Sequence, residues 1–187
     1  MEILTERLRV RAYTLGDQRE YVKMNSDSEI MRWLGGPSDN AQSIAEMEYN
    51  NATLANFSNG KVAVERLSDG VFLGMCGLSF EDWYPDDLEI GWRFQRQHWG
   101  FGYATEAALA WLHHAFLTLG IERVISISDA PNLRSISVMR RLNMKLNHVA
   151  ELGDRDRKTK CLIYAITKSE FRERPTTCGA RDRQGRR

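Results

Sequence analysis

The sequence predicts a single domain of mixed α/β class, built on one sheet with helices inserted between runs of strands. Its 187 residues are 42% hydrophobic and 27% charged, which suits one globular domain with a sizeable core. Segments with period-two alternation and segments with helical periodicity occur in turn along the chain. The strand segments come in runs, and this favours a mixed layer over a regular doubly wound sheet. Because the sequence shows no internal repeat or linker, we expect one domain over residues 1–170.

The first third of the chain predicts one strand followed by three helices. Residues 5–13 alternate apolar side chains with arginines, which is the period of a half-buried strand. Asp17 can cap the first helix, and Gly35-Gly36-Pro37 ends the second. The expected helices cover residues 17–24, 28–34 and 40–57.

The middle of the chain predicts three strands, two of them joined in a hairpin. Residues 61–67 and 71–80 flank Ser68-Asp69-Gly70, a strong turn signal. An acidic loop is expected next, followed by a strand over residues 88–94.

The last part of the chain begins with a glycine-bearing loop that opens a helix over residues 103–119, with Gly120 as its stop. A β-branched strand is expected over residues 123–128, and a helix from Asn132 to about residue 142. The closing hairpin is formed by the segments 145–151 and 158–167.

The overall composition argues against several classes of protein. No apolar run approaches the roughly 18–20 residues of a membrane span, and the first residues lack the features of a secretory signal. Three cysteines without metal-binding spacing fit a reducing cytoplasm, where we expect the protein to be located. A net charge of +1 gives no reason to expect a nucleic-acid partner.

Residues 171–187 are predicted to be a basic, disordered tail. From Pro175 onward the tail has four arginines against one aspartate, and it has few apolar residues. A nucleic-acid-binding arm is the alternative to a solvated tail.

The segment from Gln97 to Glu106 reads Gln-His-Trp-Gly-Phe-Gly-Tyr-Ala-Thr-Glu and joins a strand to a helix. A glycine turn before a helix presents unpaired N–H groups and the positive end of the helix dipole, so it predicts a phosphate or pyrophosphate site. A Walker A loop does not fit, because no lysine follows the glycines. A dinucleotide fingerprint needs a small residue where Thr105 stands, and an acidic residue ending the next strand, whereas Glu122 precedes that strand.

The motif Gln97-x-x-Gly100-x-Gly102 resembles the pyrophosphate loop of the GCN5-related N-acetyltransferase (GNAT) superfamily. Further motifs of that superfamily occur in the expected order: Glu89-Ile90-Gly91-Trp92, Gly102-Tyr103-Ala104-Thr105-Glu106-Ala107, and Asn132-x-x-Ser135-x-x-Val138. The start, Thr5-Glu6-Arg7-Leu8-x-Val10-Arg11, followed by residues 29–35, is similar to the Rim-type branch of ribosomal-protein N-terminal acetyltransferases. The resemblance spans residues 5–167.

The resemblance implies a mostly antiparallel mixed sheet of about six or seven strands, splayed in the middle, with helices on both faces. It also implies an acetyl-CoA-dependent N-acetyltransferase that moves the acetyl group directly to an amine without a metal. Asn143 replaces the glycine usually found at its position. Because asparagine tolerates the left-handed conformation, we expect this helix end to survive.

The resemblance also implies which residues hold coenzyme A. Backbone groups of the loop would bind the pyrophosphate, and the residues of this set are Gln97, Gly100, Phe101, Gly102, Tyr103 and Ala104. The backbone of Trp92, Arg93 and Phe94 would pair with the pantetheine arm like an added strand. Asn132 would hydrogen-bond the pantetheine, whereas the sequence by itself predicts a helix N-cap there, and both roles can hold together.

The reaction needs a base for the amine and an acid for the departing thiolate. Glu89, beside the predicted splay, is the first candidate for the base, and the alternative is a structural carboxylate. Glu151 and Asp154 are rivals, because some Rim-type enzymes are thought to use an acid from that region. Many members have tyrosine where Met139 stands, so we expect Ser135 to be the acid and a coenzyme A contact. The alternative for Ser135 is an ordinary first-turn serine.

Five acidic residues lie within residues 81–89, next to the predicted acetyl end of the cleft. Such a run is usually a solvated turn, but here it would also favour a cationic amine. We expect Asp82 and Trp83, together with Trp33, to line the acceptor side, although Trp33 would equally suit the core. The acceptor stays open between a protein N-terminus and a small-molecule amine such as a polyamine or an aminoglycoside-like compound. A degenerate module that binds coenzyme A as a sensor or scaffold is the alternative function, and a homodimer is compatible with the resemblance.

Overall fold

A computed structural model of the chain describes residues 1–154 and 157–172. The strands are β1 (Glu2–Leu4), β2 (Leu8–Arg11), β3 (Gly60–Arg66), β4 (Phe72–Glu81), β5 (Tyr84–Phe94), β6 (Arg123–Asp129), β7 (Lys145–Asp154) and β8 (Arg157–Thr167). The α-helices are α1 (Gln18–Ser26), α2 (Asn40–Phe57), α3 (Tyr103–His113), α4 (Leu133–Arg141) and α5 (Lys168–Arg172). Four shorter helical segments are η1 (Leu15–Asp17), η2 (Met31–Trp33), η3 (Arg96–His98) and the π-helical η4 (His114–Thr118).

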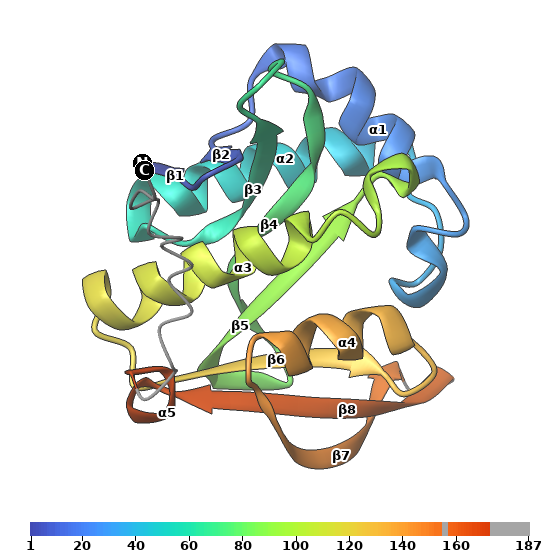
Figure 1. Cartoon of the computed structure of the whole chain (residues 1–187). Helices are drawn as coiled ribbons and strands as arrows, with labels where there is room; N and C mark the ends of the chain where they lie inside the picture. The colour runs from blue at the N-terminus through green and yellow to red at the C-terminus, as the bar shows by residue number, and fades with distance from the viewer. Residues whose placement is uncertain (155–156, 173–187) are drawn as a thin grey trace, which may run out of the picture.

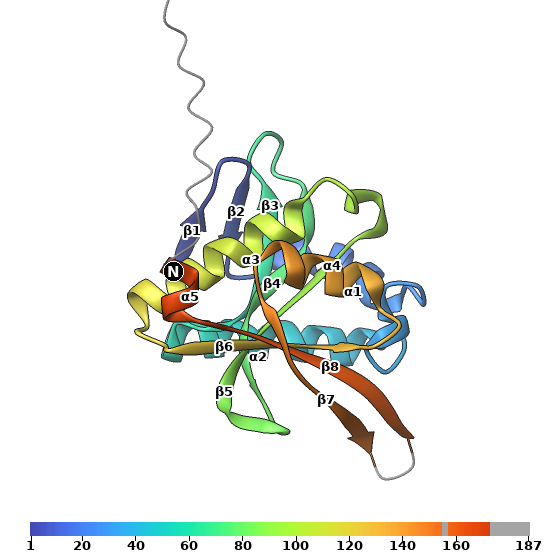
Figure 2. The same ribbon diagram turned by 60° about the horizontal axis from the view of Figure 1, so that its bottom comes forward.

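These strands form one eight-stranded sheet in the order β1-β2-β3-β4-β5-β6-β8-β7. Helices α1 and α2 cover one face of the sheet, whereas α3 and α4 cover the other (Figures 1 and 2). The predicted mixed α/β class is therefore confirmed. Among the helices in the described parts of the chain, none has the length and apolar character needed to cross a membrane.

The sheet opens between β5 and β6, which are the parallel neighbours in an otherwise antiparallel arrangement. Pairing between them is limited to Leu88 with Val124 and Glu89 with Ile125. Beyond this point β5 runs away from β6, while β6 continues beside β8 (Figure 1). The predicted splay is thus present, and it begins directly after Glu89.

Helix α2 has the bounds expected from the sequence because its signals are local. The Asp39 carboxylate accepts the N–H of Gln42 at 2.8 Å, and the Gln42 side chain accepts the N–H of Asp39 at 3.0 Å. This capping box starts the helix, and Ser58 ends it in a left-handed conformation with φ +55°.

Helix α3 packs closely on β4 and β5 because its inner face carries small residues. Ala107 and Ala108 are fully buried, and they bring the helix close to the sheet. Trp111 is also fully buried and fills the larger space one turn later.

Four details differ from the sequence-based expectation. Strand β1 was not predicted, and the sheet has eight strands where about six or seven were expected. The helix expected over residues 28–34 is reduced to the 3₁₀ segment η2, and the expected acidic loop is mostly strand β5 behind a tight turn at Asp82-Trp83. Asp17 does not cap α1, because its carboxylate instead accepts the Thr14 N–H at 2.7 Å and pairs with Arg11 at 2.7 Å.

The predicted tail mostly falls on residues 173–187, which lie outside the described part of the chain. Its first two positions belong to α5, where the side chain of Phe171 is buried.

Candidate active site

Strand β5 has an open edge on the side where β6 turns away. The N–H of Gln95 donates to a β4 carbonyl at 2.9 Å. Backbone groups of successive strand residues point to opposite edges, so those of Trp92 and Phe94 point away from β4. The Ser126 hydroxyl of β6 donates to the Ile90 carbonyl at 2.9 Å on this same edge. The edge therefore carries backbone groups with which an extended ligand can pair.

Arg93 has a structural role between these two edge residues. By the same alternation its backbone faces β4, and its side chain is buried. Nη2 donates to Glu46 of α2 at 2.9 Å, and Nη1 donates to Asn25 of α1, so Arg93 ties both helices to β5. The carbonyl of Phe94 already accepts the indole N–H of Trp99 at 2.8 Å. The Phe94 N–H and both groups of Trp92 remain directed toward the opening.

The predicted phosphate loop leads from η3 into α3 through two glycines with positive φ. Gly100 has φ +85° and Gly102, the N-cap of α3, has φ +82°. A Cβ at Gly100 would meet nothing within 4 Å, so backbone conformation, and not crowding, calls for glycine there. The first helical bond is from Glu106 N–H to the Gly102 carbonyl at 3.0 Å. The N–H groups ahead of it, including those of Tyr103 and Ala104, have no carbonyl partner within the helix and suit an anion.

Arg7 fixes this loop from the N-terminal segment. Its Nη1 donates to the Phe101 carbonyl at 3.1 Å, and its guanidinium lies 4.8 Å from the centroid of the Tyr103 ring. Its Nη2 lies 2.6 Å from the Glu106 carboxylate, which also accepts the Thr5 hydroxyl at 2.6 Å. The start of the chain thereby holds the loop and the first turn of α3 together.

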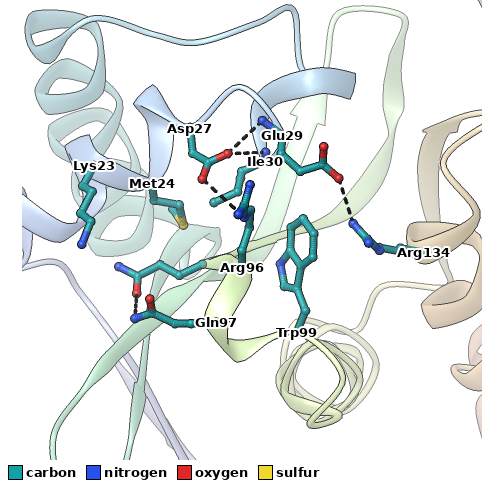
Figure 3. A pocket seen from close by; sticks show the side chains of 10 residues that line it. Lys23, Met24, Asp27, Glu29, Ile30, Arg96, Gln97, Trp99 and Arg134 are labelled. Atoms are coloured by element: carbon teal, nitrogen blue, oxygen red, sulfur yellow. Dashed lines mark hydrogen bonds and ion pairs between the residues drawn. The ribbon is translucent and has the colours of Figure 1, made fainter.

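A cavity of about 700 Å³ lies between α1, the loop after β5 and the start of α4 (Figure 3). Its wall includes Gln97 and Trp99, which follow the open edge of β5. Glu29 and Arg134 form an ion pair at 3.3 Å, and the Arg134 guanidinium lies 4.3 Å from the Trp99 ring centroid. The cavity therefore lies next to the end of β5, and its wall combines ion pairs with an aromatic ring.

Helix α4 begins beside this cavity and carries the predicted acid. The Asn132 side chain accepts the N–H of Ser135 at 3.2 Å, so the helix N-cap predicted from the sequence is confirmed. Ser135 lies in the first turn and is half-buried, whereas Met139 faces the core and is fully buried. The predicted left-handed helix end is also confirmed, because Asn143 has φ +60°.

Glu89 lies at the point where the sheet opens and belongs to a charged cluster. It is 5% exposed, and its Oε2 is 2.9 Å from the Lys61 ammonium, which is also 2.9 Å from Glu81 Oε1. The Lys61 ammonium is thus the partner of Oε2 among the described residues. Oε1 accepts the Ile127 N–H of β6 at 3.5 Å. Glu89 is therefore a buried carboxylate that is held by one ion pair and one long hydrogen bond.

Opposing effects set the ionisation of this cluster. Burial raises the pKa of Glu89 above its usual value, and the opposing charge of Lys61 only partly offsets that rise. Burial likewise raises the pKa of Glu81, but the Lys61 ammonium outweighs this effect and brings the pKa below its ordinary value. Sequence reasoning missed Lys61, because its contact with Glu89 depends on the register of three strands.

The other predicted residues lie apart from this cluster. Trp33 is half-buried in η2 with the Arg32 guanidinium 4.8 Å from its ring centroid, and Asp82 and Trp83 form the exposed β4–β5 turn. Glu151 is exposed on the outermost strand, three strands from Glu89, which is at least about 14 Å at the usual strand spacing. Asp154 ends that strand, and its side chain lies outside the described part of the structure.

Comparison with known proteins identifies the family. The chain matches the acetyltransferase (GNAT) domain over residues 7–145. It is 29% identical over 145 residues to the uncharacterized protein YkkB of Bacillus subtilis (strain 168), covering 76% of this chain and 84% of the relative. The chain belongs to the GNAT acetyltransferases and is a GNAT-type N-acetyltransferase.

Solved structures agree on the fold. A GNAT-family acetyltransferase from Bacillus anthracis superimposes with a TM-score of 0.80 at 24% identity, covering 91% of this chain and 100% of that chain. Spermidine N-acetyltransferase from Vibrio cholerae, solved with CoA and spermine, gives a TM-score of 0.72 at 18% identity, covering 89% of this chain and 99% of that chain. The GNAT fold is thereby confirmed, and the family uses acetyl-CoA.

Proposed function

We propose that this protein moves an acetyl group from acetyl-CoA directly to a primary amine, as a member of the Rim-type branch. The observation that carries the proposal is the combination of an open β5 edge with a glycine loop and helix start at its end. The open edge suits an extended arm that contains amide groups, and the glycine loop with the helix start suits a pyrophosphate.

The donor would lie along the opening between β5 and β6. When bound, it supplies the reactive acetyl thioester. Backbone groups of Trp92 and Phe94 would pair with the pantetheine arm, with Arg93 holding the strand from behind. The glycine loop would hold the pyrophosphate through the N–H groups of residues 100–104, with Gln97 at its start. Asn132 would add a side-chain contact from α4 while capping that helix.

Glu89 would accept the proton that the amine loses. Because Glu89 is only 5% exposed, the proton would reach its carboxylate through a water molecule. Ser135 would donate a proton to the departing thiolate, because Met139 has no proton to give. Glu89 is favoured over Glu151 because it lies at the opening, whereas Glu151 lies on the outermost strand.

The acceptor would be a protein N-terminal α-amine or a small amine with positive charge. The exposed turn at Asp82-Trp83 and the half-buried Trp33 are the candidate acceptor contacts. The spermine bound to the Vibrio cholerae relative makes a polyamine one member of the screening panel. Free thiols at Cys76 and Cys161 support a reducing, cytoplasmic location, and a homodimer remains part of the proposal.

The donor site is tested by Gly102→Ala. Because φ is +82° at this position, an alanine is strained by about 1–2 kcal/mol in the loop conformation that would bind the pyrophosphate. The free loop should relax away from that conformation, so we expect acetyl-CoA affinity to fall about tenfold. Gly120→Ala is the matched control, because it has φ +71° at the far end of the same helical segment and should leave affinity unchanged. Calorimetric titration of both variants gives the measurement, and unchanged affinity in Gly102→Ala would refute the loop assignment.

Turnover is tested by thiol release with a panel of peptides and amines, followed by mass spectrometry of the product. Donor binding without thiol release above background would favour the alternative function, a coenzyme A-binding sensor or scaffold.

A further inference from the structure

The cluster around Glu89 is assembled from three neighbouring strands. Lys61 of β3 is opposite Gly77 of β4, which is opposite Gly91 of β5. Directly opposed residues share one face of a sheet, and Glu89 lies two residues from Gly91 on that same face. The Lys61 side chain therefore crosses β4 and reaches Glu89. Its path is open because Gly77 and Gly91, the residues in the same row, have no side chains.

Gly91 keeps the space for the end of this lysine. A Cβ at Gly91 would lie 2.9 Å from Lys61 Cε and 3.1 Å from its Nζ. A side chain at this position would therefore push the end of Lys61 by at least a few tenths of an ångström from its place beside the carboxylates. The glycine in the motif Glu89-Ile90-Gly91-Trp92 thus has a local steric reason.

The backbone of Lys61 is held from the opposite side of the residue. Its N–H donates to the Asn50 side chain of α2 at 2.7 Å, and its carbonyl accepts the Tyr13 hydroxyl at 3.0 Å. Both of these side chains are buried. The backbone of Lys61 is consequently fixed by the fold, and its ammonium is held by the carboxylates of Glu81 and Glu89.

The charges around Glu89 come from two strands. Lys61 brings one positive charge, and Glu81 brings one negative charge that shares the same ammonium. Cys76 of β4 is next to Gly77 and lies on the opposite face of the sheet, and burial raises the pKa of its thiol, which keeps it neutral. From β6 the group that faces Glu89 is the Ile127 N–H. A buried carboxylate without its cation takes up a proton, so Lys61 and Glu81 act on Glu89 in opposite directions.

We propose that Lys61 and Glu81 are positioning residues for the base. Lys61 keeps Glu89 ionised, and Glu81 weakens this effect because it shares the same ammonium. This inference rests on the proposed function, in which Glu89 accepts a proton. It assigns to β3 and β4 a part in the reaction although neither strand borders the opening between β5 and β6.

Two substitutions should shift the acidic limb of the pH profile of kcat/KM in opposite directions. Lys61→Met removes the cation, so the limb should shift to higher pH by about one to three units, with activity recovering at high pH. Glu81→Gln removes the carboxylate that competes with Glu89 for the Lys61 ammonium. The ionised form of Glu89 is then stabilised more strongly, so the acidic limb should shift to lower pH. Lys61→Arg keeps the charge and should stay closer to the native profile than Lys61→Met.

Lys168→Met is the matched control, because it removes another ion-paired lysine, 3.2 Å from Glu122, with the same change of charge. Its profile should be native. If Lys61→Met does not fold, Glu81→Gln still tests the proposal. The proposal would be overturned if the acidic limb of the pH profile did not shift in the folded variants, or if it shifted in the same direction in both.

A second measurement separates this inference from the proposed function. The titration of the Glu89 carboxyl in the donor-free protein can be followed by ¹³C NMR and assigned with Glu89→Gln. We expect its midpoint to rise in Lys61→Met and to fall in Glu81→Gln, whether or not any amine is acetylated. A native midpoint in both variants would refute the role of Lys61 and Glu81, whereas absent turnover in the native protein would refute the proposed function.

Discussion

Asparagine residues define both ends of α4, and each does so by a different property. Asn132 uses its side-chain oxygen, which accepts the Ser135 N–H at the start of the helix. Asn143 uses its backbone, with φ +60°, while Met144 N–H donates to the Met139 carbonyl at 3.0 Å. The second arrangement is a Schellman motif with asparagine in the place of glycine. The helix that carries Ser135 is thus fixed in length by two single residues.

The left-handed position at Asn143 leads to a stability prediction. Asn143→Ala should lower the free energy of unfolding by about 1 kcal/mol, because alanine tolerates positive φ less well than asparagine. Asn143→Gly should be neutral or slightly stabilising, since glycine has no Cβ to strain. Urea unfolding of both variants measures the difference. Equal losses in the two variants would show that the asparagine side chain, and not its backbone, matters there.

At the scale of elements, Glu106 joins the N-terminal segment to the first turn of α3. Its carboxylate accepts hydrogen bonds from the Thr5 hydroxyl at 2.6 Å and from the Arg7 N–H at 3.0 Å. Partial burial raises the pKa of Glu106, but these hydrogen bonds and the Arg7 charge outweigh it and lower the pKa below its ordinary 4.5. The carboxylate also lies at the positive end of the helix dipole.

Glu106→Gln should therefore change how stability depends on pH. A carboxylate with a lowered pKa stabilises the fold fully above its unfolded pKa, and this stabilisation is lost as pH falls through the folded pKa. We expect the variant to lose about 1–2 kcal/mol at neutral pH and to approach the native protein in stability as the pH falls below the ordinary 4.5 and through the lowered folded pKa. Glu6→Gln makes the same charge change at an exposed neighbour and is the control. A constant difference between Glu106→Gln and the native protein at every pH would contradict the argument.

The elements also show where sequence reasoning succeeds. Helix α2 was predicted with its observed bounds because the Asp39 capping box lies within four residues. Asp17 was assigned the wrong role because its partner, Arg11, approaches from a neighbouring strand. Lys61 was missed for the same reason, since only strand register brings it to Glu89. The turn at the glycine loop was predictable because the positive φ of Gly100 and Gly102 is a local property of the sequence, whereas its ligand stays a prediction.

At the scale of the whole molecule, the sheet consists of two parts joined by a short parallel contact. Strands β1 to β5 form one part, and β6, β8 and β7 form the other, with two residue pairs between them. Helix α3 follows β5 and α4 follows β6, so both helices begin near the carboxyl ends of the two parallel strands. Ligands in α/β proteins bind at such crevices beyond strand carboxyl ends. The topology therefore explains why the end of β5, the segment that leads into the glycine loop and the start of α4 border one cavity.

This arrangement predicts an alternating pattern of amide hydrogen exchange along β5. The N–H groups of Arg93 and Gln95 face β4 and should be protected without any ligand, whereas those of Trp92 and Phe94 face the opening and should exchange faster. Saturating acetyl-CoA should slow Trp92 and Phe94 by about tenfold or more and leave Arg93 and Gln95 nearly unchanged, because a ligand bound as an added strand pairs with one edge only. Amide exchange followed by NMR on free and bound protein provides the measurement. Uniform slowing along β5 would instead indicate general stabilisation of the fold, and unchanged rates at Trp92 and Phe94 would place the arm of the donor elsewhere.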